Sequence, residues 1–186
     1  MVGCLTVTFA LAAMGGGPPS HDARATHPVG ETAAPPAVAD LLTGDSRRIR
    51  AMDSRTTHVL QEGVRRSRTF AALVTALHRT DVIVYVEATE ALPSKIGGRL
   101  LLQAVTPRER YLRVQIRRSL RLNEAIEVMA HELQHALEVA GEPSVLDEAG
   151  LVALYRRIGY ATSGEHWFDT LAARRTGEQV RVELRS

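Results

Sequence analysis

The stretch His131-Glu132-Leu133-Gln134-His135 decides how the rest of the chain is interpreted. It lies within residues 123–140, a run without Pro or Gly that is rich in Ala, Leu and Glu and therefore predicts a helix. Asn123 is a candidate N-cap and Gly141 a candidate C-terminal stop. Residues four apart lie one turn apart on the same helix face, so both imidazoles can reach one ion. The spacing predicts a metal site.

Two imidazoles on one helix face suit zinc, which binds histidine nitrogen at about 2.0–2.1 Å. His131 and His135 are therefore the predicted ligands, and Zn²⁺ is the predicted cofactor. Glu132 directly follows the first histidine and can take a proton from water held at the same ion. The alternative is a helix with two ordinary histidines and a solvated glutamate.

Upstream of this helix, the hydrophobic pattern predicts a long helix followed by a small sheet. The helix is expected over residues 54–80, with Gly63 as the point at which it kinks or splits. Strands are expected over residues 81–87, 99–105 and 111–117. In the last of these strands the alternation is regular, and the inward-facing residues are Leu112, Val114 and Ile116.

Downstream, residues 144–158 predict a second helix, with Ser144 as its N-cap. Residues 180–184 alternate like a strand but also fit a last helix, and the pattern leaves both open. Asp169 is expected either to cap a short helix over residues 170–175 or to orient a ligand histidine from outside the ligand shell.

This order of elements resembles that of the zincin metallopeptidases, whose motif is matched at His131, Glu132 and His135. The resemblance covers roughly residues 50–160. It implies an α+β fold in which a small mixed sheet packs on the active-site helix and a second helix follows. It also implies a zinc peptidase that acts on a peptide or protein. The metzincin branch requires a glycine three residues after the second motif histidine and a third histidine three residues later. This sequence has Glu138 and Gly141 at those two positions, so it does not match that branch.

The gluzincin branch of that superfamily takes its third ligand from a glutamate on the next helix. Glu148, in the sequence Asp147-Glu148-Ala149, resembles that ligand and is our prediction. Glu138, Asp147 and Glu142 are the alternatives. Glu138 lies about 10.5 Å along the helix axis from His131, a wide spread for ligands of one ion.

Peptide hydrolysis also requires a group that stabilises the oxyanion formed when water attacks the carbonyl. The active-site helix offers no such donor, so the candidates come from later in the chain: Tyr155, Tyr160 and His166. Together with Glu132, Tyr160 and His166 are the predicted catalytic residues.

Three regions follow from the composition. Residues 1–25 contain a short apolar run typical of a signal peptide, residues 26–45 are a flexible linker rich in Pro, Ala and Gly, and residues 46–186 form the zincin-like domain. The only cysteine, Cys4, lies in the apolar run, so no disulfide is possible within one chain. We therefore expect an exported protein, periplasmic or secreted, with no stable membrane span.

The 186 residues, 45% of them hydrophobic, suffice for one domain with a core. The net charge is +2, but Lys95 is the only lysine and the arginines are scattered, so we expect no nucleic-acid partner. The alternative functions are a non-catalytic zinc-binding module on the same scaffold and a partner-binding domain with an accidental motif. Nothing in the sequence indicates substrate specificity or oligomeric state.

Overall fold

The computed structural model describes residues 5–6, 40, 42, 47–161 and 167–185 of the chain. The predicted signal peptide (1–25) and linker (26–45) lie almost entirely outside the described residues, and so does His166. The elements, in chain order, are β1 (Leu5–Thr6), β2 (Ile49–Ala51), α1 (Ser54–Arg66), α2 (Arg68–His78), β3 (Val82–Thr89), β4 (Gly98–Val105), β5 (Arg110–Arg117), α3 (Leu122–Ala140), α4 (Glu148–Ile158), β6 (Tyr160–Ala161), β7 (Trp167–Asp169) and α5 (Leu171–Glu183).

The main sheet has four strands in the order β2-β3-β5-β4. Strands β2, β3 and β5 are parallel, whereas β4 pairs antiparallel with β5 and forms one edge. The predicted inward-facing residues of β5, Leu112, Val114 and Ile116, are all fully buried. The expected α+β class with a small mixed sheet is therefore confirmed. Strand β2 was not predicted, because three residues with Arg50 in the middle carry no hydrophobic period.

The helix expected over residues 54–80 is divided into α1 and α2 at Ser67, one turn after the predicted kink at Gly63. The Ser67 hydroxyl accepts a hydrogen bond from the Phe70 backbone N–H at 3.0 Å and so caps α2. Gly63 serves packing instead, because a Cβ placed there would lie 2.9 Å from the Phe70 ring. The break lets both helices cover the sheet.

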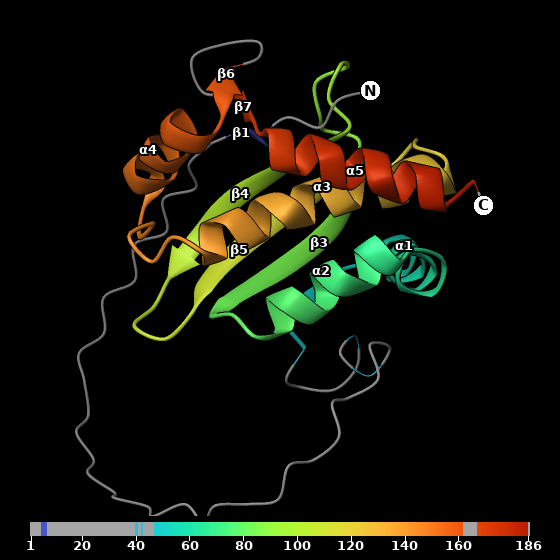
Figure 1. The fold of residues 1–186 in the computed structure, drawn as a ribbon, viewed down its shortest axis with the longest axis horizontal. Coiled ribbons are helices and arrows are strands. Elements are labelled where there is room, and N and C mark those ends of the chain that lie inside the picture. The colour runs from blue at the N-terminus through green and yellow to red at the C-terminus, as the bar shows by residue number, and fades with distance from the viewer. Residues whose placement is uncertain (1–4, 7–39, 41, 43–46, 162–166, 186) are drawn as a thin grey trace, which may run out of the picture.

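The HELQH helix, α3, begins one residue before the predicted cap Asn123 and ends as expected before Gly141. Its first turn is closed by Glu124, whose carboxylate accepts a hydrogen bond from the Arg121 backbone N–H at 2.9 Å. The helix lies between the sheet and α5, and it contacts β4, β5, α1 and α2 as well (Figure 1). Thirteen residues of α5 follow its outer side, so α3 is covered on most of its surface.

The end of α3 is held by the buried side chain of Arg110, the first residue of β5. Its guanidinium donates hydrogen bonds to the carbonyl oxygens of Val139, Ala140 and Glu142 at 2.8–3.1 Å. It also donates two bonds of 2.8 Å to the carboxylate of Asp81, just before β3. One arginine thus satisfies the last carbonyls of α3 and joins them to the sheet.

The C-terminal part differs from the sequence prediction at the start of α4, and it decides a choice that the sequence left open. Helix α4 begins at Glu148 rather than near Ser144, because the Asp147 carboxylate caps it by accepting a bond from the Gly150 N–H at 2.8 Å. Residues 180–183 belong to the helix α5, which settles the choice between strand and helix. Strands β1, β7 and β6 form a second, small sheet beside α4.

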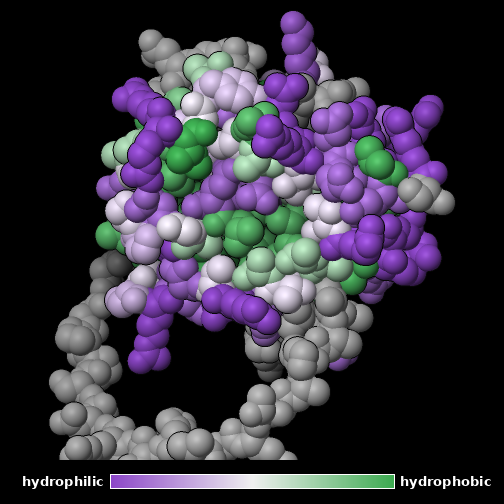
Figure 2. Space-filling model, viewed as in Figure 1, coloured by the Kyte–Doolittle hydropathy of each residue, from purple (hydrophilic) through white to green (hydrophobic). Residues whose placement is uncertain are grey.

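Polar side chains cover most of the face shown in Figure 2, and apolar ones gather near its middle.

Within the described part of the chain, no helix has both the length and the apolar character that crossing a bilayer requires.

Candidate metal centre

His131 and His135 lie on the same face of α3, as the four-residue spacing predicts. Their Nε2 atoms are 3.1 Å apart, and the rings meet edge to face with centroids 4.8 Å apart. His131 is 5% exposed and His135 is fully buried. The two nitrogens therefore face each other in the buried interior of the fold.

Asp169 brings a carboxylate to these two nitrogens. It is the last residue of β7 and is fully buried, and its Oδ1 lies 3.4 Å from Nε2 of His131 and 3.9 Å from Nε2 of His135. Among the described residues, His131, His135 and Asp169 form the group of side chains that could hold a metal ion. We expected Asp169 to cap a helix or to act from outside the ligand shell, whereas it stands among the candidate ligands themselves.

The distances between these three atoms can be compared with the ligand–ligand distances around a bound zinc ion. With bonds of about 2.0–2.1 Å, neighbouring corners of a tetrahedron around zinc lie about 3.4 Å apart. The observed separations of 3.1, 3.4 and 3.9 Å fall on both sides of that value. Two histidine nitrogens and one carboxylate oxygen are also a donor set found at catalytic zinc sites, where a fourth position is open. The residues fit such an ion.

The predicted third ligand, Glu148, is not part of this group. It is the first residue of α4 and half-exposed, at the position where acidic side chains favour the helix dipole. Of the alternatives, Asp147 caps the same helix, and Glu142 is bonded to Ser144 and Arg157. The carboxylate that the structure places beside the two histidines is that of Asp169, which lies farther along the chain than Glu148, at the end of β7.

Glu138, the remaining alternative, hydrogen-bonds to the side of His135 that faces away from His131. Its Oε2 accepts a hydrogen bond from Nδ1 of His135 at 2.8 Å, and its Oε1 accepts one from the Thr170 hydroxyl at 2.6 Å. A carboxylate only accepts, so Nδ1 of His135 carries the proton, and Nε2, which keeps its lone pair, lies 3.1 Å from Nε2 of His131 and 3.9 Å from Oδ1 of Asp169. Glu138 therefore fixes the ring of His135 in the form that binds a metal.

Glu132 is fully buried on α3, and neither of its carboxylate oxygens has a hydrogen-bond partner in the described part of the chain. It lies against β4, where a Cβ added to Gly98 would come within 2.9 Å of its Oε1. Burial, and then the nearby carboxylates of Asp169 and Glu138, raise the pKa of Glu132 well above its ordinary value. Burying a carboxyl group without a hydrogen-bond partner costs folding free energy. Groups buried in this way are typical of functional sites.

Burial governs the electrostatics of the metal-binding group as well. It lowers the pKa of His131 to about 3, with a further contribution from His135, so this imidazole is neutral at physiological pH. Burial also raises the pKa of Asp169, although the neighbouring His135 and a bond from the Thr170 N–H act in the opposite direction. Neutral imidazole is the form in which histidine binds metals.

Of the predicted oxyanion donors, the structure brings Tyr160 to the site. Its hydroxyl donates to Oδ2 of Asp169 at 3.2 Å and accepts a bond from Nη1 of Arg174 at 3.1 Å, and the side chain is 42% exposed. Tyr155 is instead fully buried, and its hydroxyl donates to the backbone carbonyl of His135 at 3.1 Å, so its role is support of α3. The third candidate, His166, lies outside the described residues.

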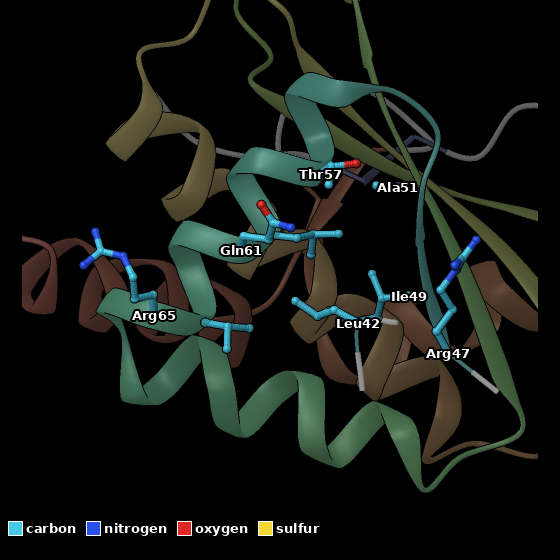
Figure 3. A pocket seen from close by; sticks show the side chains of 9 residues that line it. Leu42, Arg47, Ile49, Ala51, Thr57, Gln61 and Arg65 are labelled. Atoms are coloured by element: carbon cyan, nitrogen blue, oxygen red, sulfur yellow. The ribbon is translucent and has the colours of Figure 1, made fainter. Parts of the chain in front are cut away.

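A separate apolar hollow of about 560 Å³ lies between α1 and β2, where it is lined by Leu42, Ile49, Ala51 and Leu60 among others (Figure 3). It shares no residue with the metal-binding group. Its volume therefore says nothing about the chemistry of the histidines.

Comparison of the chain with protein-family models, with curated proteins and with solved structures finds no match. The site must therefore be interpreted from its own geometry.

Proposed function

We propose that this chain is a zinc-dependent hydrolase of the zincin type, and most simply a peptidase. The observation that carries the proposal is the joint burial of three metal-binding atoms 3.1–3.9 Å apart and an unpaired carboxylate on the same helix. His131, His135 and Asp169 would hold the ion, and Glu132 would be the general base.

A zinc ion at this position would supply a Lewis acid that acidifies water and polarises a carbonyl group. Glu132 would take a proton from the attacking water and later deliver it to the leaving amine. Its raised pKa makes the ionised carboxylate a stronger base, which favours the first half of this cycle, in which Glu132 accepts the proton. The Tyr160 hydroxyl donates its one proton to Asp169, so it would stabilise a developing oxyanion only by turning that proton away from the carboxylate.

Complete burial of His135, Asp169 and Glu132 favours a second candidate, a closed metal site that stabilises the fold without catalysis. Such a site would hold zinc, and substitution of Glu132 would change no activity. The two candidates differ in whether a substrate reaches the ion, and the turnover of a Glu132 variant distinguishes them.

Elemental analysis of the purified chain tests the ligand set. We expect about one zinc per chain in the wild type and in Glu148→Ala, and loss of the metal in His131→Ala and Asp169→Ala. Glu148→Ala is the matched control, since it removes a carboxylate that the fold keeps outside the metal-binding group. A wild-type chain that takes up no zinc on dialysis would refute the proposal.

A further inference from the structure

Beside the proposed zinc site lies a cation, Arg174, that has no carboxylate partner among the residues the structure describes. Arg174 is exposed on α5 and donates from Nη1 to the Tyr160 hydroxyl, which in turn donates to Oδ2 of Asp169. A single phenol therefore separates the guanidinium from a proposed metal ligand. Arg174 is also close enough for its charge to act on both His131 and Asp169.

The acids that could neutralise Arg174 have other partners. Glu178 follows it by one helical turn, but its carboxylate accepts a hydrogen bond from Arg181 at 3.0 Å. The two oxygens of Asp169 accept bonds from the Thr170 N–H and the Tyr160 hydroxyl. Across the described part of the chain, no ion pair within 4.0 Å includes Arg174.

A guanidinium carries five N–H donors in a rigid fork that matches a carboxylate, and only one bond of this one is used within the described residues. Arg174 stands on a regular helix whose first turn is capped by Thr170, so the position of its backbone is fixed. Leu171, 55% exposed, precedes it by three residues and offers an apolar contact on the same side of α5.

We infer that Arg174, held in place by its hydrogen bond to the Tyr160 hydroxyl, recognises a carboxylate of the substrate close to the bond that is cut. This inference rests on the proposed function and names the substrate class: peptides with a carboxylate beside the scissile bond. That carboxylate belongs either to an Asp or Glu side chain or to the free C-terminus of a peptide, and both present the same group to the guanidinium.

Three hydroxamate probes separate these sources. A succinyl hydroxamate, which chelates an accessible zinc ion, is joined to Ala-Ala amide, to Ala-Ala with a free C-terminus, or to Ala-Glu amide. Their dissociation constants are measured by calorimetry on the zinc-loaded wild type, Arg174→Gln and Arg175→Gln. Arg175 is the matched control, an exposed arginine one residue farther along α5.

In the wild type we expect at least one acidic probe to bind about tenfold more tightly than the neutral amide. Arg174→Gln should lose this preference, and Arg175→Gln should keep it. The acidic probe that binds more tightly shows whether the carboxylate comes from a free C-terminus or from an acidic side chain. Equal affinities for all three probes in the wild type, or a preference that survives in Arg174→Gln, would overturn the inference alone. A chain that binds no zinc, or a zinc-loaded chain that binds no probe, would overturn the proposed function with it.

Discussion

Oε2 of Glu138 lies 2.8 Å from Nδ1 of His135, while the other oxygen of the same carboxylate accepts a hydrogen bond from Thr170 at the start of α5. The second histidine of the motif is thereby oriented by an acid one turn later on its own helix. The same acid ties that helix to the segment that supplies Asp169.

Removal of this acid should weaken metal binding without removing a ligand. We expect Glu138→Ala to lower zinc affinity about 10–100-fold, because His135 loses the group that fixes its protonated nitrogen. Competition with a chromophoric chelator measures the change. Glu178→Ala, which removes an exposed carboxylate on α5, is the control. An unchanged zinc affinity in Glu138→Ala would refute the orienting role.

Substitution of the buried base should separate metal binding from turnover. Glu132→Gln should retain zinc and lose about 10²–10⁴-fold in the rate of peptide cleavage, since the amide cannot accept the proton. Zinc content and cleavage of a mixed quenched-fluorescent peptide set are measured side by side. Glu148→Gln should change neither quantity. Equal cleavage rates in Glu132→Gln and the wild type would exclude the proposed mechanism.

The close approach of β4 to α3 predicts a steric effect at one glycine. A Cβ at Gly98 would lie 2.6 Å from Cγ1 of Val128 and 2.9 Å from Oε1 of Glu132. Gly98→Ala should therefore destabilise the fold by about 1–3 kcal/mol and displace Glu132. At Gly97 the nearest atom is Val128 Cγ2 at 3.1 Å, so Gly97→Ala should cost less. Urea denaturation of both variants checks the order, and the reverse order would contradict this packing.

Arg110 should be the arginine whose loss is most costly within the sheet. Arg110→Met leaves the carbonyl oxygens at the end of α3 without their donor and Asp81 without its partner, so we expect a loss of about 3 kcal/mol. Arg113→Met on the same strand removes only an exposed pair with Glu87 at 3.7 Å and should cost well under 1 kcal/mol. Chemical denaturation compares the two, and similar losses would disprove the capping role of Arg110.

The carboxylate of Glu183 should make stability depend on acidic pH. Burial would raise its pKa, but hydrogen bonds from Ser67 and Thr69 outweigh this and lower the pKa from 4.5 to about 2. Its contribution is therefore complete above about pH 4.5 and is lost as the pH falls toward 2. We expect about 1–2 kcal/mol after allowance for solvent screening.

Unfolding free energies of the wild type and Glu183→Gln, measured between pH 6 and pH 3, test this dependence. Other acids titrate in both proteins, so the informative quantity is the difference between them. That difference should shrink as the pH falls. A difference that stays constant with pH would show that the Glu183 carboxylate does not hold α5 through its charge.

Local patterns in the sequence were enough for the helix of the motif and for the convergence of His131 and His135, because the 3.6-residue period and the four-residue spacing are properties of one helix. They were also enough for the buried face of β5, since alternation is a property of one strand. The position of Glu132 beside the first histidine follows for the same reason. These features require no knowledge of how distant segments meet.

Only the tertiary structure decided which carboxylate joins the histidines and which group stands beside them. Asp169 lies 34 residues after His135 in the sequence, and it reaches the site because β7 ends beside the two histidines before α5 begins. Arg174 lies near Asp169 because α5 directly follows β7, and its guanidinium hydrogen-bonds to the Tyr160 hydroxyl. Local periodicity carries no information about such an approach, because the path is fixed by side-chain packing between α3 and α5 and by pairing of β6 with β7.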